Sequence, residues 1–226
     1  MDSPLQSLPL FMLGPVPIMS AVVVTWAIMA VLVLGAALLT RHLTLRPSKA
    51  QAVAELLVTT VDSQIRDVTG APPAPYRAFI GTVFVFVLFA NWSSLIPGVT
   101  PPTGAMETPA ALAAVVFLSI IYFGIREGGL GGFLSGFARP NAMMIPLNML
   151  ESITRSFSMF VRLFGNVMSG VFVIAIVGSL AALFVPIPLM ALDLLTGAVQ
   201  AYIFAVLSMV FITGAVEKGA PKPQEA

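Results

Sequence analysis

One stretch in the C-terminal half of the sequence carries polar side chains at steps of three and four residues. These residues are Asn148, Glu151, Arg155, Ser158, Arg162, Asn166 and Ser169. On a helix of 3.6 residues per turn they form a single stripe, and the other faces are rich in Ile, Met, Phe, Val and Leu. A polar stripe on an apolar helix is unsuited to lipid, so we expect it to face a protein partner or a water-filled passage.

Arg162 is the residue of this stripe with the most specific chemistry. It lies deep in the helix, and no charged residue occurs from Leu163 to Leu192. An ionisable group at the centre of a membrane helix costs at least about 2.5–3.5 kcal/mol, which favours a functional role. Because arginine keeps its charge in almost any environment, Arg162 would repel cations and attract a carboxylate. The alternative is a structural ion pair with Glu151 or Asp193, which does not explain why the whole stripe is polar.

A second polar stripe occurs near the C-terminus. It consists of Asp193, Thr196, Gln200 and Ser208. Asp193 follows Pro188 by only five residues, so we expect it near the outer end of its helix, where it can exchange protons with external water. Gln200 lies two turns deeper and would meet Arg162 if the two helices packed antiparallel. The alternative for Gln200 is a plain interhelical hydrogen bond, worth about 0.6 kcal/mol on average.

Residue counts exclude several kinds of chemistry. The sequence has no Cys and one His, which leaves no disulfide framework and no His or Cys cluster for a metal. The glycine-rich stretch 128–132 lacks the lysine and hydroxyl residue of a phosphate-binding loop. A net charge of +1 gives no basic footprint for nucleic acid. We therefore expect no cofactor, no metal and no nucleic-acid partner.

The composition indicates the elements that must position these residues. Of the 226 residues, 58% are hydrophobic and 9% are charged, where soluble domains have about 25% charged residues. A helix needs about 20 apolar residues to cross a bilayer. The uncharged windows are 3–40, 78–106, 108–125, 163–192 and 194–216. They predict one all-α membrane domain, 1–226, with five transmembrane helices and a short polar tail. The predicted segments are 18–40, 78–97, 108–125, 141–180 and 189–216 for the helices, and 217–226 for the tail.

Between the first two spans, residues 48–69 have a different pattern. Ser48 is a candidate N-cap, and apolar residues recur at helical spacing among charged ones. This pattern predicts an amphipathic helix on the cytoplasmic face of the membrane; the alternative is a solvated connector. Lys and Arg follow the first and third spans and the last one, whereas residues 98–108 contain none. This bias predicts an outer N-terminus and a cytoplasmic C-terminus.

Three motifs, in this order along the chain, resemble subunit a of bacterial F-type ATP synthases. They are FANWSSLIPG at 89–98, RLFGN at 162–166 and QAYIF at 200–204. The resemblance runs from about residue 20 to 217. It implies that the helices at 141–180 and 189–216 are long, tilted and packed against a rotor ring of c subunits. It also implies b subunits of a peripheral stalk, the rest of the F1Fo complex, and the inner cell membrane as the location.

The resemblance implies a mechanism in which the subunit binds no ATP and carries no catalytic site. Two half-channels pass protons to and from a carboxylate on each c subunit, so that ion flow turns the ring. Arg162 matches the essential arginine of the family, while Asn166 and Gln200 match polar positions along the path. Asp193 falls where relatives carry an ionisable residue, and we expect it in the outer half-channel. Glu151, Ser158 and Asn148 are further candidates for lining the path.

Two positions depart from the family pattern. Many bacterial relatives carry Glu nine residues after the arginine, where this sequence has Val171. The acid that some relatives carry fourteen residues before the arginine is Asn148 here, with Glu151 one turn later. A sodium-translocating variant therefore remains an alternative to the proton path. Two further functions would suit a chain of apolar helices: a stand-alone secondary transporter, which the lack of an internal repeat disfavours, and a structural subunit in which Arg162 would serve assembly alone.

Overall fold

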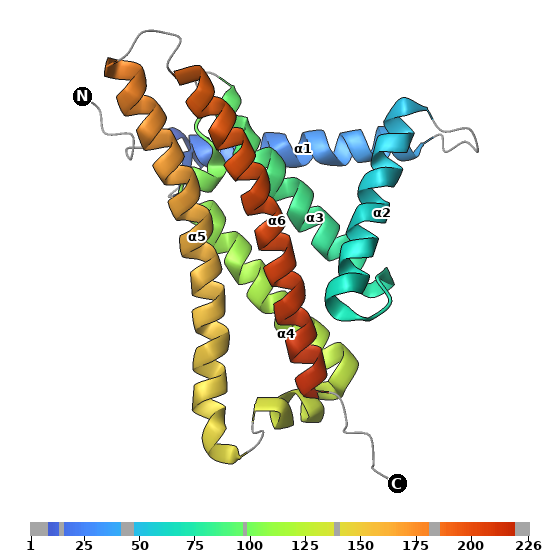
Figure 1. The fold of residues 1–226 in the computed structure, drawn as a ribbon. Helices are drawn as coiled ribbons and strands as arrows, with labels where there is room; N and C mark the ends of the chain where they lie inside the picture. The colour runs from blue at the N-terminus through green and yellow to red at the C-terminus, as the bar shows by residue number, and fades with distance from the viewer. Residues whose placement is uncertain are drawn as a thin grey trace.

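The structure is a computed structural model that describes residues 9–13, 16–41, 48–96, 99–137, 141–180 and 186–219. Six α-helices occur in these residues (Figure 1). They are α1 (Ser20–Thr40), α2 (Lys49–Thr69), α3 (Ala74–Trp92), α4 (Glu107–Phe137), α5 (Ile145–Leu180) and α6 (Pro186–Gly219). Three short 3-10 turns join them: η1 (Ser93–Leu95), η2 (Pro102–Gly104) and η3 (Ala142–Met144). The all-α class is confirmed.

Five helices are long and apolar enough to cross a membrane, as predicted from the sequence. They are α1, α3, α4, α5 and α6, while α2 is the polar exception. The chain is therefore a multi-pass membrane protein. A short antiparallel hairpin of β1 (Pro9–Leu13) and β2 (Val16–Met19) precedes α1, and β2 includes the first residues of the span predicted to begin at 18.

Two predicted boundaries need correction. The third span was predicted to end at 125, but α4 continues past Arg126 and Glu127 to Phe137. It does so by breaking at Gly129, whose φ of 67° separates two helical pieces. The second piece packs back on the first, since a Cβ at Gly124 would lie 2.6 Å from Phe133 Cδ2. The predicted tail, 217–226, begins as helix, because α6 runs to Gly219; residues 220–226 lie outside the described residues.

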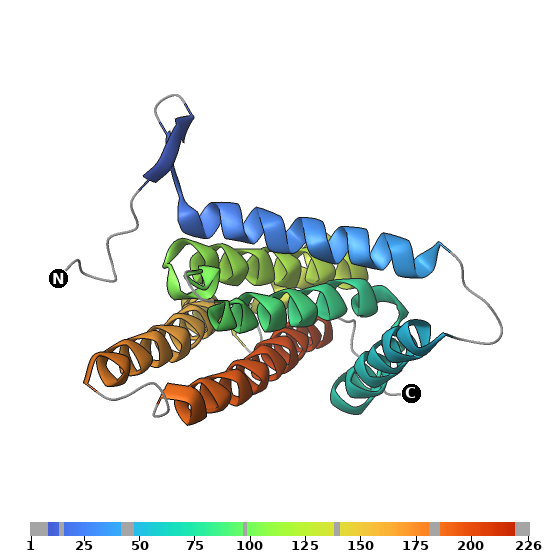
Figure 2. The same cartoon turned by 90° about the horizontal axis from the view of Figure 1, so that it is seen from above.

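The helices form successive layers. In Figure 1, α5 and α6 run side by side in opposite directions at the front of the molecule. Figure 2, seen from above, shows α3 and α4 behind them, and α1 behind these. α6 is the central element, because it packs on α3, α4 and α5. Its inward face carries small residues, Gly197, Ala201 and Ala205, among larger ones. Small residues let membrane helices approach each other closely.

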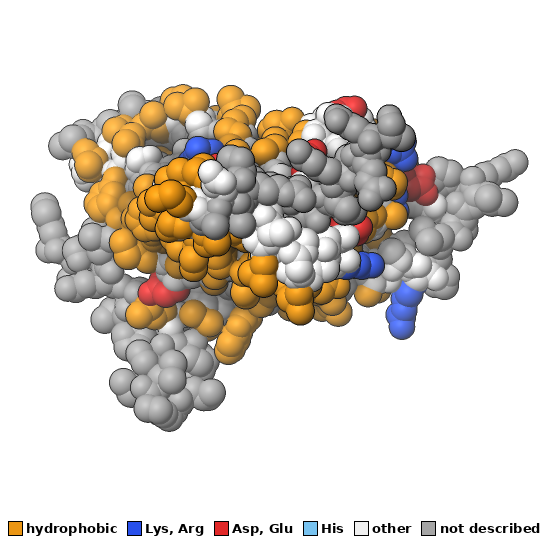
Figure 3. Space-filling view, turned by 90° about the horizontal axis from the view of Figure 1, so that it is seen from below, with side chains coloured by type: hydrophobic (Ala, Val, Ile, Leu, Met, Phe, Trp, Pro, Cys, Tyr) orange, Lys and Arg blue, Asp and Glu red, His pale blue; other side chains and the backbone are white. Residues whose placement is uncertain are grey.

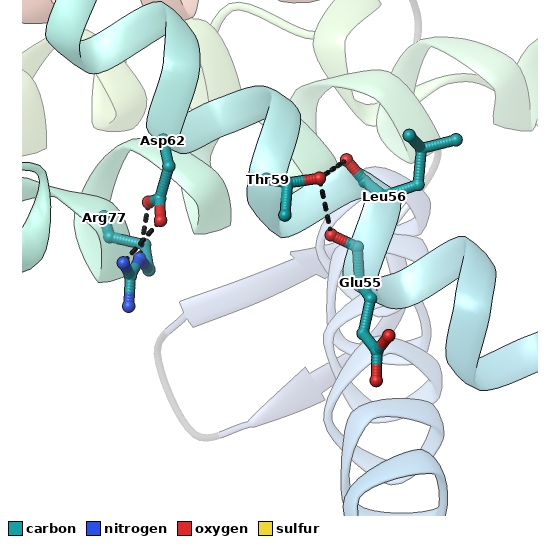
Figure 4. Close-up of polar contacts among 5 residues, drawn as sticks. All are labelled: Glu55, Leu56, Thr59, Asp62 and Arg77. Atoms are coloured by element: carbon teal, nitrogen blue, oxygen red, sulfur yellow. Dashed lines mark hydrogen bonds and ion pairs between the residues drawn. The ribbon is translucent and has the colours of Figure 1, made fainter. Parts of the chain in front are cut away.

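Helix α2 is fixed to the bundle by polar contacts. The Ser48 hydroxyl caps its first turn by accepting from the Gln51 N–H at 3.3 Å. Arg77 of α3 donates two hydrogen bonds to the Asp62 carboxylate, and Figure 4 shows the guanidinium facing both oxygens. This contact lowers the pKa of Asp62 below its usual value. The Tyr202 hydroxyl of α6 donates to the side-chain carbonyl of Gln64 at 2.8 Å.

The apolar face of α2 is divided between two environments. Val61 and Ile65 are buried in the core of the bundle. Val53 and Leu56 are each 66% exposed and face away from the chain. The space-filling view in Figure 3 shows hydrophobic side chains over much of the described part of this face, with charged groups in small separate clusters. Such a surface suits contact with lipid and with other membrane subunits rather than with water.

Candidate functional site

Helix α5 turns most of its polar stripe away from the rest of the chain. Its buried face consists of Met159, Leu163 and Val167, which pack toward α4, α6 and η2. Four residues of the stripe are exposed: Glu151, Ser158, Arg162 and Ser169. Asn148 is buried, and Arg155 and Asn166 are half-buried, at the edge of the stripe next to the bundle. The stripe is therefore a polar surface on an otherwise apolar helix, open to a partner.

Arg162 stands apart from the carboxylates that were considered as its structural partners. Glu151 forms an ion pair with Arg155, and Asp193 accepts a hydrogen bond from Ser94. Among the residues that the structure describes, Arg162 makes no ion pair with an acid. The structural-pair alternative is thus wrong for Glu151 and Asp193. An exposed arginine in a membrane span without an acidic partner among the described residues is available to pair with an acid from another molecule.

Asp193 belongs to α6 and lies beside α5, toward the opposite end of that helix from Glu151. The Ser94 hydroxyl donates to Asp193 Oδ2 at 3.1 Å. A Cβ on Gly170 of α5 would collide with Asp193 Oδ1, so the missing side chain leaves the space that the carboxylate occupies. Asp193 and Ser94 also line a cavity of about 230 Å³, together with Thr100 and Val171. The acid at this cavity is thus supplied by α6 and lies beside Val171 of α5.

A buried polar network next to this cavity was not anticipated from the sequence. The Asn91 side-chain amide donates to the carbonyl of Gly197 at 2.9 Å, and the Thr103 hydroxyl donates to Asn91 Oδ1 at 2.8 Å. Trp92 Nε1 donates to the carbonyl of Leu194 at 3.2 Å. Asn91 falls within the FANWSSLIPG motif, and an asparagine in an apolar run is the signal that could have indicated it. The network docks the end of α3 onto α6.

Of the second polar stripe, only Asp193 and Gln200 keep their functional groups available to other elements. Thr196 and Ser208 donate to carbonyls of their own helix, at 3.0 and 2.8 Å. Gln200 is 6% exposed, and its Nε2 has no hydrogen-bond partner within the described part of the chain. A buried amide donor without a partner costs about 1–3 kcal/mol, which points to a water or another ligand at this position.

The N-terminal end of the stripe lines a larger, open cavity of about 620 Å³. Its polar lining residues are Asn148, Glu151, Thr154, Arg155 and Ser158. The Asn148 amide donates to the carbonyl of Phe137 at 2.8 Å, which ties α5 to the second piece of α4. Of the sequence-predicted residues, Asn148, Glu151 and Ser158 line this cavity and Asp193 lines the smaller one, whereas Arg162, Asn166 and Gln200 line neither.

Fold and site together define a multi-pass helical membrane protein whose longest helix, α5, carries a polar stripe between two cavities. Residues 22–213 match the sequence model of the ATP synthase A chain family. The chain is 54% identical over 221 residues to ATP synthase subunit a 2 of Bradyrhizobium sp. strain BTAi1, covering 96% of this chain and 99% of the relative. It is 43% identical over 207 residues to ATP synthase subunit a of Albidiferax ferrireducens, covering 91% and 90%.

A further relative is ATP synthase subunit a 2 of Acaryochloris marina, 42% identical over 198 residues, covering 87% of this chain and 85% of the relative. The chain belongs to the ATP synthase A chain family.

Proposed function

We propose that this chain is the ion-translocating stator subunit of an F-type ATP synthase and that α5 and α6 face the ring of c subunits. The observation that carries the proposal is the exposed stripe of α5, with an arginine that makes no ion pair in its own described chain. A ring carboxylate passing along this face would supply the missing counter-charge. Membrane potential supplies about 2.3 kcal/mol per charge per 100 mV to drive that passage.

In this proposal the two cavities belong to two half-channels. Asp193 and Ser94 serve the outer one, while Asn148, Glu151 and Ser158 serve the inner one. Asp193 lies against Gly170, which is nineteen positions after Glu151 on α5, or about 28 Å along the helix axis. That distance is too long for direct transfer between the acids of the two half-channels, so in this proposal the ion rides on the ring. Arg162 is then the barrier that prevents a leak past the ring.

Gln200 and Asn166 have a separate role in the proposal. Gln200 is buried and keeps an amide donor free of described partners, which suits a water on the path from Asp193 toward the ring. Asn166 is half-buried on the stripe one turn beyond Arg162. A neutral amide both donates and accepts hydrogen bonds. These two residues can therefore bond to water along the path without adding a fixed charge that would compete with Arg162 for the ring carboxylate.

The coupling ion is the proton in the main proposal. Sodium is the second candidate, and the specific observation in its favour is the lining of the Asp193 cavity. Ser94 and Thr100 add hydroxyl groups beside a single carboxylate there, and oxygen atoms are the ligands that hard cations take. The two candidates differ in the effect of sodium on pumping, which the experiment below measures.

The surroundings follow from the same proposal. The chain lies in the inner cell membrane with its N-terminus outside and its C-terminus in the cytoplasm, next to b subunits and the rest of the F1Fo complex. α2 lies on the cytoplasmic face, with Val53 and Leu56 in the lipid interface. Of the basic residues that set this orientation, Arg46, Arg139 and Lys222 lie outside the described residues. Arg41 and Lys49 flank the inner ends of α1 and α2.

The test is ATP-driven ion pumping in inside-out vesicles that carry the assembled complex, with subunit content measured for each variant. Arg162→Ala should assemble and abolish pumping, while Arg126→Ala, a change at an exposed arginine of α4, should pump as the wild type does. Acidification that needs no sodium indicates the proton. Uptake of labelled sodium, with acidification suppressed by sodium, indicates the second candidate. An assembled Arg162→Ala complex that pumps at the normal rate would refute the proposal.

A further inference from the structure

A second arginine lies on the same stripe as Arg162, and the structure holds it in a different way. Arg155 precedes Arg162 by seven residues, or about 10 Å along the helix axis. It donates a hydrogen bond to Glu151 Oε1 and forms an ion pair with that carboxylate. On its other side, its guanidinium carbon lies 5.2 Å from the ring centroid of Phe211 on α6, within cation–π range. Arg155 is therefore held between two elements.

Arg155 lines two cavities. On one side is the open cavity of about 620 Å³ that Glu151 and Ser158 also line. On the other side, Arg155, Ser152 and Phe211 line a small space of about 30 Å³, enough for a water molecule. The guanidinium thus stands at the mouth of the inner half-channel assigned above.

The guanidinium of Arg155 carries a positive charge. Alone at this mouth it would repel every cation that enters or leaves. The Glu151 and Arg155 side chains are 43% and 39% exposed, and ion pairs this exposed contribute little to stability. A contribution to stability therefore does not explain the ion pair, whereas neutralising the charge at the mouth of the half-channel would explain it.

We propose that Glu151 acts as the counter-charge of Arg155, which Phe211 holds in place, so that the inner mouth is neutral and passes cations. This inference rests on the proposed function and refines it. In it Glu151 is not required to bind the ion itself, because it acts by offsetting the charge of Arg155. Arg162 then remains the uncompensated cation of the stripe among the residues that the structure describes.

The test compares Glu151→Gln, Arg155→Gln and the double variant in ATP-driven pumping per assembled complex. Glu151→Gln leaves Arg155 unpaired, and one unit charge in a partly exposed mouth should slow pumping about tenfold. The double variant removes both charges and should pump about fivefold faster than Glu151→Gln. Salt on the cytoplasmic side should partly restore the single variant, because the screening length falls from about 10 Å at 0.1 M to about 3 Å at 1 M. A merely structural pair would show neither rescue nor salt recovery.

Phe211 gives a second measurement that keeps both charges. Phe211→Leu removes the aromatic ring and should slow pumping in the Arg155 background but not in the Arg155→Gln background. Phe211→Tyr keeps the ring and is the matched control. A double variant at 151 and 155 that pumps no faster than Glu151→Gln would overturn the inference, as would equal effects of Phe211→Leu in both backgrounds.

Arg162→Ala, measured in the same vesicles, separates this inference from the proposed function. If Arg162→Ala pumps normally, the proposed function fails, and the inference fails with it. If Arg162→Ala abolishes pumping and the double variant shows no rescue, only the inference fails.

Discussion

The contact between Gly170 and Asp193 allows one prediction to be worked out in detail. Adding a methyl group to Gly170 places a Cβ in collision with Asp193 Oδ1, 3.1 Å from Cγ and 3.7 Å from Oδ2. These atoms belong to the end of a short side chain, so rotation of the carboxylate relieves the contact at little cost to the backbone. The rotation would pull Oδ2 away from the Ser94 hydroxyl, 3.1 Å distant.

The magnitude follows from that lost hydrogen bond. A hydrogen bond to a charged group is worth about 1.5–3 kcal/mol net. At the lower end, the working position of the carboxylate would be occupied about tenfold less, since about 1.4 kcal/mol is a factor of ten. The Gly-to-Ala change itself favours helix by up to about 1 kcal/mol. Gly170→Ala should therefore leave stability nearly unchanged and slow ion entry about tenfold.

The assay is ATP-driven pumping per assembled complex in inside-out vesicles. Gly35→Ala is the matched control, because a Cβ on this α1 glycine meets nothing within 4 Å. Ser94→Ala removes the same hydrogen bond from the other side and should give a similar loss. The double variant of Gly170→Ala and Ser94→Ala should be no slower than either single change, since both act on one contact. Pumping by Gly170→Ala at the rate of Gly35→Ala would refute the reasoning.

Three further predictions concern how the helices are held. Asn91→Ala should lower the free energy of unfolding of the complex by about 1–3 kcal/mol, because it removes the hydrogen bonds to Gly197 and Thr103 and leaves the Thr103 hydroxyl unpaired. Thermal inactivation measures the effect, and an unchanged midpoint would contradict the network. Asp62 has a lowered pKa, so its contribution is present above about pH 4 and is lost as the pH falls through the folded value; amide exchange in α2 should rise on acidification, and Asp62→Asn should remove that rise. Tyr202→Phe should weaken the attachment of α2 to α6 by about 0.6 kcal/mol and leave assembly unchanged. The measurement is the cross-linking yield between cysteines placed in α2 and α6, and a yield equal to the wild type would exclude the Gln64 contact.

Much of the architecture could be predicted because its signals are local. A transmembrane span is a run of apolar residues long enough to cross the bilayer, and α5 shows its stripe through the 3.6-residue period. The cap at Ser48 and the spacing of Val61 and Ile65 likewise predicted α2. The extension of α4 was missed because Arg126 and Glu127 look like the end of a span. Gly129 then turns the chain so that the next piece folds back on the bundle.

The candidate site, like the fold, could be predicted from the sequence only in part. Sequence indicated the candidate residues of the path, since a charge or an amide is conspicuous in an apolar run. It could not indicate which of them meet. Asn91 and Gly197 are 106 residues apart, and nothing local connects them.

By itself, the sequence determined the class of protein, the number of spans and the polar stripe that contains Arg162. These properties depend on composition and on periodicity along one helix, and both are written in consecutive residues. The Glu151–Arg155 pair also belongs to this local part, because residues four apart on one helix are neighbours. The tertiary structure decided that Asp193 of α6 lies against Gly170 of α5. It also decided that Arg162 is left facing outward. The place of Asp193 and the outward face of Arg162 depend on how α5 is rotated against α4 and α6, and that rotation results from the packing of Leu163 and its neighbours into a shared core.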